Sequence, residues 1–128
     1  MAQTEFSIQL LEAAAHDLCV WKKLIDDADV HDSMLGFHAQ QAVEKCLKAV
    51  LAHERVAFRR THDLAELLDA VADAGLAAPP FSDRLDELNP FAVEARYGMG
   101  GDQPLDRALV DSWILACFEW ARVHLLTS

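Results

Sequence analysis

Helix-breaking residues are scarce in this sequence. The chain has 4 prolines and 5 glycines in 128 residues, and no proline occurs before position 79. Proline removes a backbone hydrogen bond inside a helix and glycine weakens the helix, so their scarcity favours long helices. Strand-like alternation of apolar and polar residues is also missing. We therefore predict an all-α fold.

Cysteine and long apolar runs are in short supply as well. The three cysteines, Cys19, Cys46 and Cys117, are odd in number and widely spaced, and each lies in an apolar helical pattern. This arrangement predicts structural thiols in a reducing compartment rather than a disulfide framework. No apolar run approaches the roughly 18 residues that cross a bilayer, and the first ten residues lack the features of a signal peptide. We expect a cytoplasmic protein with no membrane partner.

Positive charge is limited, because 21 acidic residues outnumber 11 basic ones and the net charge is -10 at pH 7. Broad adhesion to nucleic acid or to anionic lipid rests on a basic surface, so this balance argues against it. The exception is residues 45–60, where five basic residues accompany a single acidic residue, Glu54. This region is either a phosphate-facing patch or a solvated helix end followed by a basic turn.

Several common sites have no counterpart in the sequence. No pair of cysteines or histidines has the spacing of a zinc finger or a zinc protease, so we expect no metal and no cofactor. The glycine cluster at 98–101 lacks the strand, the helix and the Lys-Ser/Thr ending of a phosphate-binding loop. No serine is flanked by glycines as in a nucleophile elbow.

Helical periodicity divides the chain into a small number of segments. A first helix is predicted from about Thr4 to residue 25, and a second from a cap at Asp32 or Ser33 to about residue 53. A third begins at Thr61 and ends near Gly75, and a shorter stretch from 82 to 97 is broken at Pro90. A final helix is launched by Asp102 and Pro104. We predict one domain, 1–128, folded as an up-and-down antiparallel bundle of about four main helices with a broken connector.

The predicted second helix has two distinct faces. Its apolar side predicts a core, and its opposite side carries polar residues at intervals of three, four, three and seven: His38, Gln41, Lys45, Lys48 and Arg55. Glu44 is placed to pair with Lys48 across one turn. The polar stripe is able to contact a phosphate or ribose, to lie against a partner subunit, or simply to face solvent.

Three sequence patterns resemble one known family. Residues 38–49, HAQQAVEKCLKA, are similar to the characteristic second helix of HEPN domains. Residues 61–64, THDL, resemble the family's start of the next helix, and Arg96-Tyr97 stands where many members carry an Arg-Tyr pair. The three matches occur in the expected order across most of the chain, so the resemblance is specific.

The resemblance implies a helical bundle that forms a homodimer and is often encoded beside a minimal nucleotidyltransferase as a toxin–antitoxin pair. In the ribonuclease members, an Arg followed four to six residues later by a His forms a metal-independent RNA-cutting site across the dimer axis. This chain departs from that pattern, because no histidine follows Arg96 at the required spacing. Arg55 and His62 satisfy the spacing, but they flank a turn where the family motif is not expected.

The candidate catalytic residues are Arg96, Tyr97 and His62. Cleavage of RNA without metal needs a group that activates the 2′-hydroxyl and a cation for the phosphorane charge. Arg96 supplies a cation, and a histidine is a better acid or base at neutral pH than a tyrosine. His62 and Asp63 are also explained as the first turn of a helix. The candidate ligand-binding residues are His38, Gln41, Lys45, Lys48 and Asp63.

The leading hypothesis is a dimeric component of a toxin–antitoxin or defence module that binds a nucleotidyltransferase partner and holds nucleotide or RNA in the dimer cleft. The first alternative is an active metal-independent ribonuclease, and the second is a bundle that binds a small molecule. Exposed apolar residues are expected at the dimer surface, and the candidates are Phe81, Phe91, Tyr97 and Met99, all of which suit the core equally well.

Overall fold

The computed structural model describes residues 2–92 and 104–127. The described chain is all-α, as predicted. Its elements are α1 (Ala2–Leu24), α2 (Asp32–His53), α3 (Leu64–Asp73), the 3-10 helix η1 (Leu85–Phe91) and α4 (Arg107–Leu126).

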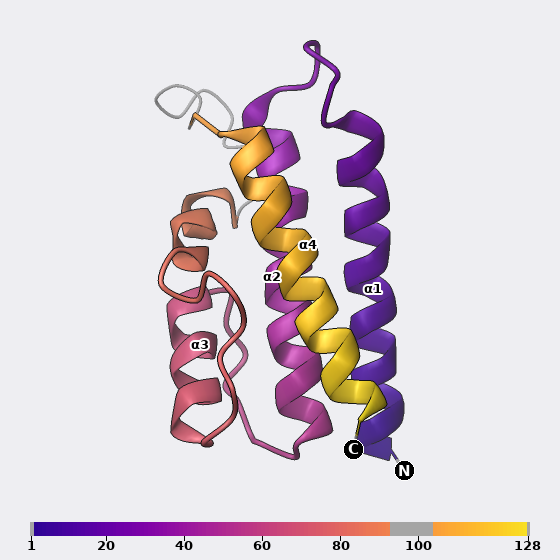
Figure 1. The fold of residues 1–128 in the computed structure, drawn as a ribbon, viewed down its shortest axis with the longest axis vertical. Coiled ribbons are helices and arrows are strands. Elements are labelled where there is room, and N and C mark those ends of the chain that lie inside the picture. Colours follow the sequence, from indigo (N-terminus) through magenta and orange to yellow (C-terminus); the bar gives the residue numbers. More distant parts are fainter. Residues whose placement is uncertain (1, 93–103, 128) are drawn as a thin grey trace.

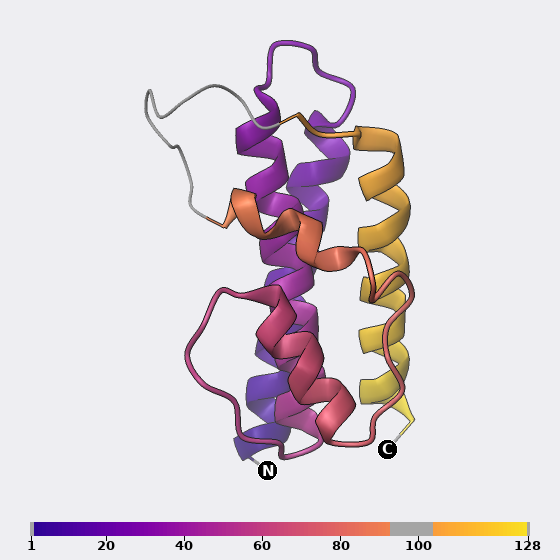
Figure 2. The same cartoon turned by 90° about the vertical axis from the view of Figure 1, so that its left-hand side faces the viewer.

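The three long helices stand side by side, with α4 in front of α2 and α1 at one edge (Figure 1). Helix α3 and η1 cover the flank of α2 (Figure 2). Helix α1 is antiparallel to both α2 and α4, whereas α2, α3 and α4 share one direction (Figures 1 and 2). The shared direction arises because the chain after α2 and the chain after α3 each return along the bundle before the next helix begins.

Helix α2 is the centre of the bundle and packs against α1, α3, η1 and α4. Its apolar side is buried as the helical pattern predicts, and small residues such as Ala39, Ala42 and Ala49 let the neighbouring helices approach closely. Gly36 is the extreme case, because a Cβ atom there would overlap the aromatic ring of Phe91. The close contact between α2 and η1 therefore requires glycine.

Several predicted helix starts are wrong by a few residues. Helix α1 begins at Ala2 rather than at a Thr4 cap. Helix α2 has Asp32 as its first residue and His31 as its N-cap, and the His31 side chain forms no capping bond. Helix α4 begins at Arg107 rather than near Asp102. In that helix the carboxylate of Asp106 accepts a hydrogen bond from the Leu109 amide, so Asp106 rather than Asp102 marks the start of the helix.

The third helix also starts later than predicted, at Leu64. Thr61 lies before it in a turn, where its hydroxyl accepts the backbone amide of Asp63. Asp63 is the N-cap, and its carboxylate accepts the amide of Ala65 at 2.9 Å. Asn89, which precedes Pro90 in the broken stretch, accepts a hydrogen bond from the Leu64 amide and helps to cap α3.

The broken connector is confirmed. Its described part is η1, which contains Pro90 and buries Leu85, Leu88 and Phe91. Phe91 is therefore a core residue rather than a dimer-surface candidate, and Phe81 is exposed. The other two candidates, Tyr97 and Met99, lie outside the described residues.

Two of the three thiols are buried, as predicted for structural cysteines. Cys46 and Cys117 lie in the core, whereas Cys19 is exposed on α1. The hydrogen bond with Cys117, together with burial, raises the pKa of the Cys46 thiol well above its ordinary value. Among residues 2–92 and 104–127, no helix combines the length and apolarity needed to cross a membrane.

Candidate functional site

A buried carboxylate organises one half of the polar face of α2. Glu44 lies in the middle of the helix, and only 5% of its side chain is exposed. Four side chains surround it: Gln40, Gln41, Lys48 and His62. We call this group the Glu44 cluster. It brings together three of the predicted site residues, namely Gln41, Lys48 and His62.

Each oxygen of the Glu44 carboxylate accepts hydrogen bonds. Oε1 accepts from Nε2 of Gln40 at 3.1 Å and lies 2.9 Å from Nδ1 of His62. Oε2 accepts from Nζ of Lys48 at 3.0 Å, which confirms the predicted pair across one turn. Gln40 also donates to the backbone carbonyl of His62 at 3.1 Å, so the turn before α3 is attached to α2 at two points.

These contacts decide the ionisation of Glu44. Burial by itself raises the pKa of a carboxyl group. The hydrogen bonds from His62, Gln40 and Lys48, together with the charge of Lys48, outweigh that effect and lower the pKa of Glu44 below its ordinary value. The carboxylate is therefore ionised at neutral pH and accepts the Nδ1 proton of His62. The His62 side chain is 68% exposed, so the rest of the ring faces solvent.

The other two predicted residues on this face meet a different carboxylate. Nζ of Lys45 donates to Oδ2 of Asp17 at 2.7 Å, and Nδ1 of His38 lies 2.9 Å from Oδ1 of the same group. Asp17 belongs to α1 and is buried. The polar face therefore consists of two clusters, one joining α1 to α2 and one joining α2 to the turn before α3.

Asp63 takes part in capping. Its carboxylate accepts the Ala65 amide and also accepts from Nδ2 of Asn89 at 3.0 Å. Asp63 was predicted to bind a ligand, and its carboxylate already accepts hydrogen bonds from two groups of the protein.

The basic segment 45–60 is mostly neutralised by the chain itself. Lys45 and Lys48 are paired as described, and Arg59 forms a two-pronged ion pair with Glu66 at 3.0 and 2.6 Å. Arg55 has φ 61 and lies beyond the end of α2, so it does not continue the helical stripe. Neither Arg55 nor Arg60 forms an ion pair with a residue in the described part of the chain.

A match to a known family decides the identity of the fold. The sequence model of the HEPN domain matches residues 8–115 of the 128-residue chain. The chain belongs to the HEPN family. The matched span contains both polar clusters and Arg96-Tyr97, although those two residues lie outside the described residues. No curated protein and no solved structure matches the chain significantly.

The alternative Arg-to-His pair of this HEPN domain is spread along the bundle. His62 is bonded to Glu44, whereas Arg55 follows the last residue of α2, His53. At about 1.5 Å per residue, nine residues of helix separate these levels by about 13 Å. The end of α2 near Arg55 and the His62 ring therefore lie at different levels of the bundle.

Sequence reasoning missed two residues that organise the polar face of the HEPN domain, Asp17 and Gln40. Gln40 falls at an angle between the polar stripe and the apolar side of α2, and it is fully buried. A glutamine at this boundary angle, one turn before a glutamate, is the signal of a buried polar network. Asp17 carries no such signal, because its partners are on another helix. Among the described residues, no three His, Cys, Asp or Glu side chains are grouped to hold a metal ion.

Proposed function

We propose that this HEPN domain is a non-catalytic binding module of a toxin–antitoxin or defence system. In this proposal it forms a homodimer, pairs with a minimal nucleotidyltransferase, and holds nucleotide or RNA in the dimer cleft through the polar face of α2. The ligand-binding residues are His38, Gln41, Lys45, Lys48 and Asp63, with Arg96 and Tyr97 contributed by the segment before α4.

The observation that carries the proposal is the internal pairing of the cations on this face. Lys45 lies 2.7 Å from Asp17, and Lys48 lies 3.0 Å from Glu44. A site that cleaves a polyanion needs positive charge that is free to meet the phosphate. Cations that are already matched by carboxylates suit a polar protein surface or a single nucleotide better than a strand of RNA.

A direct test measures the binding of the purified domain to the nucleotidyltransferase encoded by a neighbouring reading frame and to ATP, both by calorimetry. We expect binding of one or both, weakened at least tenfold by Lys45→Glu on the polar face. Arg122→Ala, on the exposed side of α4, is the matched control and leaves binding unchanged. Failure to bind either ligand, from folded protein, contradicts the proposal.

The ribonuclease remains the second candidate because of one feature of His62. A buried carboxylate holds Nδ1 of its ring at 2.9 Å while most of the ring is exposed. A carboxylate–imidazole pair of this kind orients a general acid or base. Here His62 and Arg96 act on the RNA, and Glu44 orients His62.

The nuclease candidate is tested by incubating labelled single-stranded and structured RNA with the protein in EDTA. Cleavage that is lost in His62→Ala and in Arg96→Ala, but retained in Arg122→Ala, replaces the binding-module proposal with a metal-independent ribonuclease. Absence of cleavage by folded, dimeric protein supports the binding module.

A further inference from the structure

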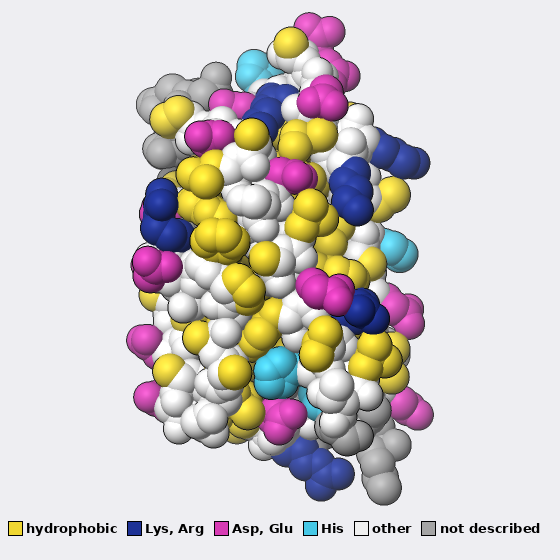
Figure 3. All heavy atoms as spheres, viewed as in Figure 1, with side chains coloured by type: hydrophobic (Ala, Val, Ile, Leu, Met, Phe, Trp, Pro, Cys, Tyr) yellow, Lys and Arg dark blue, Asp and Glu magenta, His cyan; other side chains and the backbone are white. Residues whose placement is uncertain are grey.

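A groove on the outside of the bundle takes no part in the proposed function. Helices α1 and α4 both pack against α2, and α1 contacts α4 less extensively than it contacts α2. Between α1 and α4 lies a groove of about 450 Å³, which we call the α1–α4 groove. Hydrophobic side chains are visible along this boundary of the two helices (Figure 3). The volume is within the usual range of sites for small molecules.

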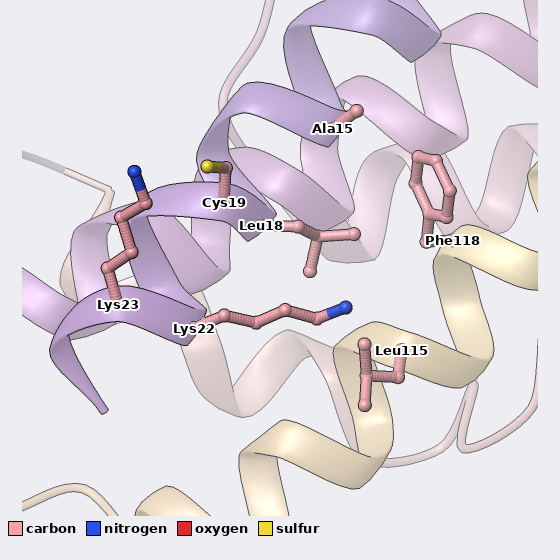
Figure 4. Close-up of a pocket in the computed structure, with 7 residues that line it drawn as sticks. All are labelled: Ala15, Leu18, Cys19, Lys22, Lys23, Leu115 and Phe118. Carbon is pink, nitrogen blue, oxygen red and sulfur yellow. The ribbon is translucent and has the colours of Figure 1, made fainter. Parts of the chain in front are cut away.

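The walls of the α1–α4 groove are apolar. Leu18 of α1 is buried, whereas Leu115 and Phe118 of α4 are only partly buried. Leu18 and Leu115 extend into the groove from its two sides, and Ala15 and Phe118 lie together at one end of it (Figure 4). A hydrocarbon chain in this position would remove from water the apolar surface that the two α4 side chains leave exposed.

A cation crosses the other end of the groove. Lys22 extends from α1 between Leu18 and Leu115, and its ammonium group points towards α4, whereas Lys23 points away from the groove (Figure 4). Neither lysine forms an ion pair with any residue that the structure describes. The groove therefore has an apolar end and a positively charged end, as a site for an amphipathic anion requires.

The two lysines of α1 differ in this respect from the two lysines of α2. Lys45 is paired with the buried carboxylate of Asp17, and Lys48 is paired with that of Glu44. Acidic residues outnumber basic ones by 21 to 11 in the whole chain, so carboxylates are the more abundant partners. Lys22 nevertheless has none, and its charge is available to an anion from outside the protein.

We propose that the α1–α4 groove binds a dissolved alkyl carboxylate, with the carboxylate on Lys22 and the chain along the apolar walls. Ala15 and Lys22 are seven residues apart on α1, which corresponds to about 10 Å along the helix. With carbon–carbon bonds of about 1.5 Å in a zigzag, an unbranched chain of about eight carbons spans this length. Because one ammonium group reaches into the groove, a head group with a single negative charge matches it.

The size of the groove favours such a ligand over a protein partner. Its residues on α1 span about two turns of the helix, whereas a standard protein–protein interface buries about 800 Å² on each partner. The inference is also independent of the proposed nucleotide or RNA site. No residue of the groove belongs to the Glu44 cluster or to the pairs that Asp17 forms.

The first test titrates isotope-labelled protein with octanoate and follows the backbone amides by NMR. We expect a Kd below about 1 mM, with the largest shift changes at residues 15–22 and 115–118. Hexanoate is expected to bind about fivefold more weakly, because it buries two fewer CH₂ groups. Octanol and octylammonium, which have the same chain with a neutral or a cationic head group, are expected to bind at least tenfold more weakly.

The second test reverses the charge at the end of the groove. Lys22→Glu is expected to weaken octanoate binding at least tenfold at low salt and to make octylammonium the better ligand. Lys23→Glu makes the same change of charge one residue along, about 100° around the helix, and is the matched control. It is expected to change the Kd by less than about threefold. Thermal unfolding checks that both variants, which alter exposed residues, are folded.

Three outcomes would overturn the proposal. The first is octanoate that does not bind, or that shifts amides on the polar face of α2 instead of those at the groove. The second is equal binding of the three head groups, or equal effects of the two lysine variants. The third is binding to phosphatidylglycerol vesicles without binding to dissolved octanoate, since the groove would then recognise a membrane surface. The proposed function is tested separately, with the nucleotidyltransferase and ATP.

Discussion

At the scale of single residues, Glu44 is the most consequential side chain on the central helix. A buried carboxylate is costly unless hydrogen bonds and a counter-charge compensate it. Glu44 has all of these, because both of its oxygens accept hydrogen bonds and Lys48 supplies positive charge. Its partners lie on α2 and in the turn before α3, so the same residue that organises the polar face also fixes the entry to α3.

The stability contribution of Glu44 depends on pH. Its pKa is lower in the folded protein than its ordinary value, so ionised Glu44 stabilises the fold. That stabilisation is complete above about pH 5 and is lost as the pH falls through the ordinary value of about 4.3 towards the lowered one. We expect Glu44→Gln to lower the free energy of unfolding by about 2 kcal/mol at pH 7. The difference from wild type shrinks below about pH 4.

Urea denaturation of both proteins from pH 3 to pH 8 measures this difference. Glu66→Gln is the matched control, because Glu66 also has a lowered pKa through its pair with Arg59 but belongs to an exposed ion pair. Solvent screens that pair, so the control shows a much smaller pH-dependent change. A Glu44→Gln difference that is the same at every pH contradicts the assignment of Glu44 as an ionised, stabilising group.

At the scale of secondary-structure elements, the contact between α2 and η1 depends on Gly36. Replacing a helical glycine with alanine ordinarily stabilises a helix by up to about 1 kcal/mol. Here the added methyl group meets the ring of Phe91, so we expect Gly36→Ala to destabilise the protein by about 1–3 kcal/mol. Thermal unfolding followed by circular dichroism measures the change. Stabilisation by Gly36→Ala would show that η1 does not pack as described.

The turn between α1 and α2 is held by a residue from the far end of the chain. Arg107, at the start of α4, donates to the backbone carbonyls of Ile25 and Asp27 at 2.9 and 3.0 Å, and to that of Val30. It also donates to the carboxylate of Asp32 at 3.0 Å. One guanidinium therefore satisfies carbonyl groups of the turn that follows α1 and fixes the start of α4 against it.

Removing this guanidinium is expected to be more costly than removing a surface arginine. Arg107→Ala should lower the free energy of unfolding by about 2 kcal/mol, because several hydrogen bonds to a charged group are lost together. Arg122→Ala, on the same helix, removes only an exposed pair with Glu119 and should leave the free energy of unfolding nearly unchanged. Equal losses in chemical denaturation would mean that Arg107 does not stabilise the turn.

At the scale of the whole molecule, the net charge of -10 governs contact with nucleic acid. The paired cations of the polar face leave little positive charge to release counterions from RNA. In a fluorescence-anisotropy titration at about 150 mM salt, we expect the protein not to bind generic single-stranded RNA. We expect binding of micromolar strength only for a specific ligand. Salt-dependent binding to arbitrary sequences at that salt would contradict this reading of the surface.

The sequence by itself determined the all-α fold, the HEPN family and the approximate limits of the helices. These follow from local rules: few helix breakers, apolar residues at helical spacing, and short motifs within single elements. The pairing of Glu44 with Lys48 was predictable for the same reason, since both residues lie one turn apart on one helix. Arg96 and Tyr97 remain sequence-based predictions.

Only the tertiary structure decided which polar residues meet. Asp17 reaches Lys45 and His38 from another helix, and His62 reaches Glu44 across a turn. Such partners are far apart in the chain, so no local pattern relates them. The single polar face predicted for α2 is therefore divided between two clusters in the structure. The starts of α3 and α4 differ from the prediction for a related reason: Asp63 caps α3 with help from Asn89, which is distant in the chain, and Asp106 caps α4.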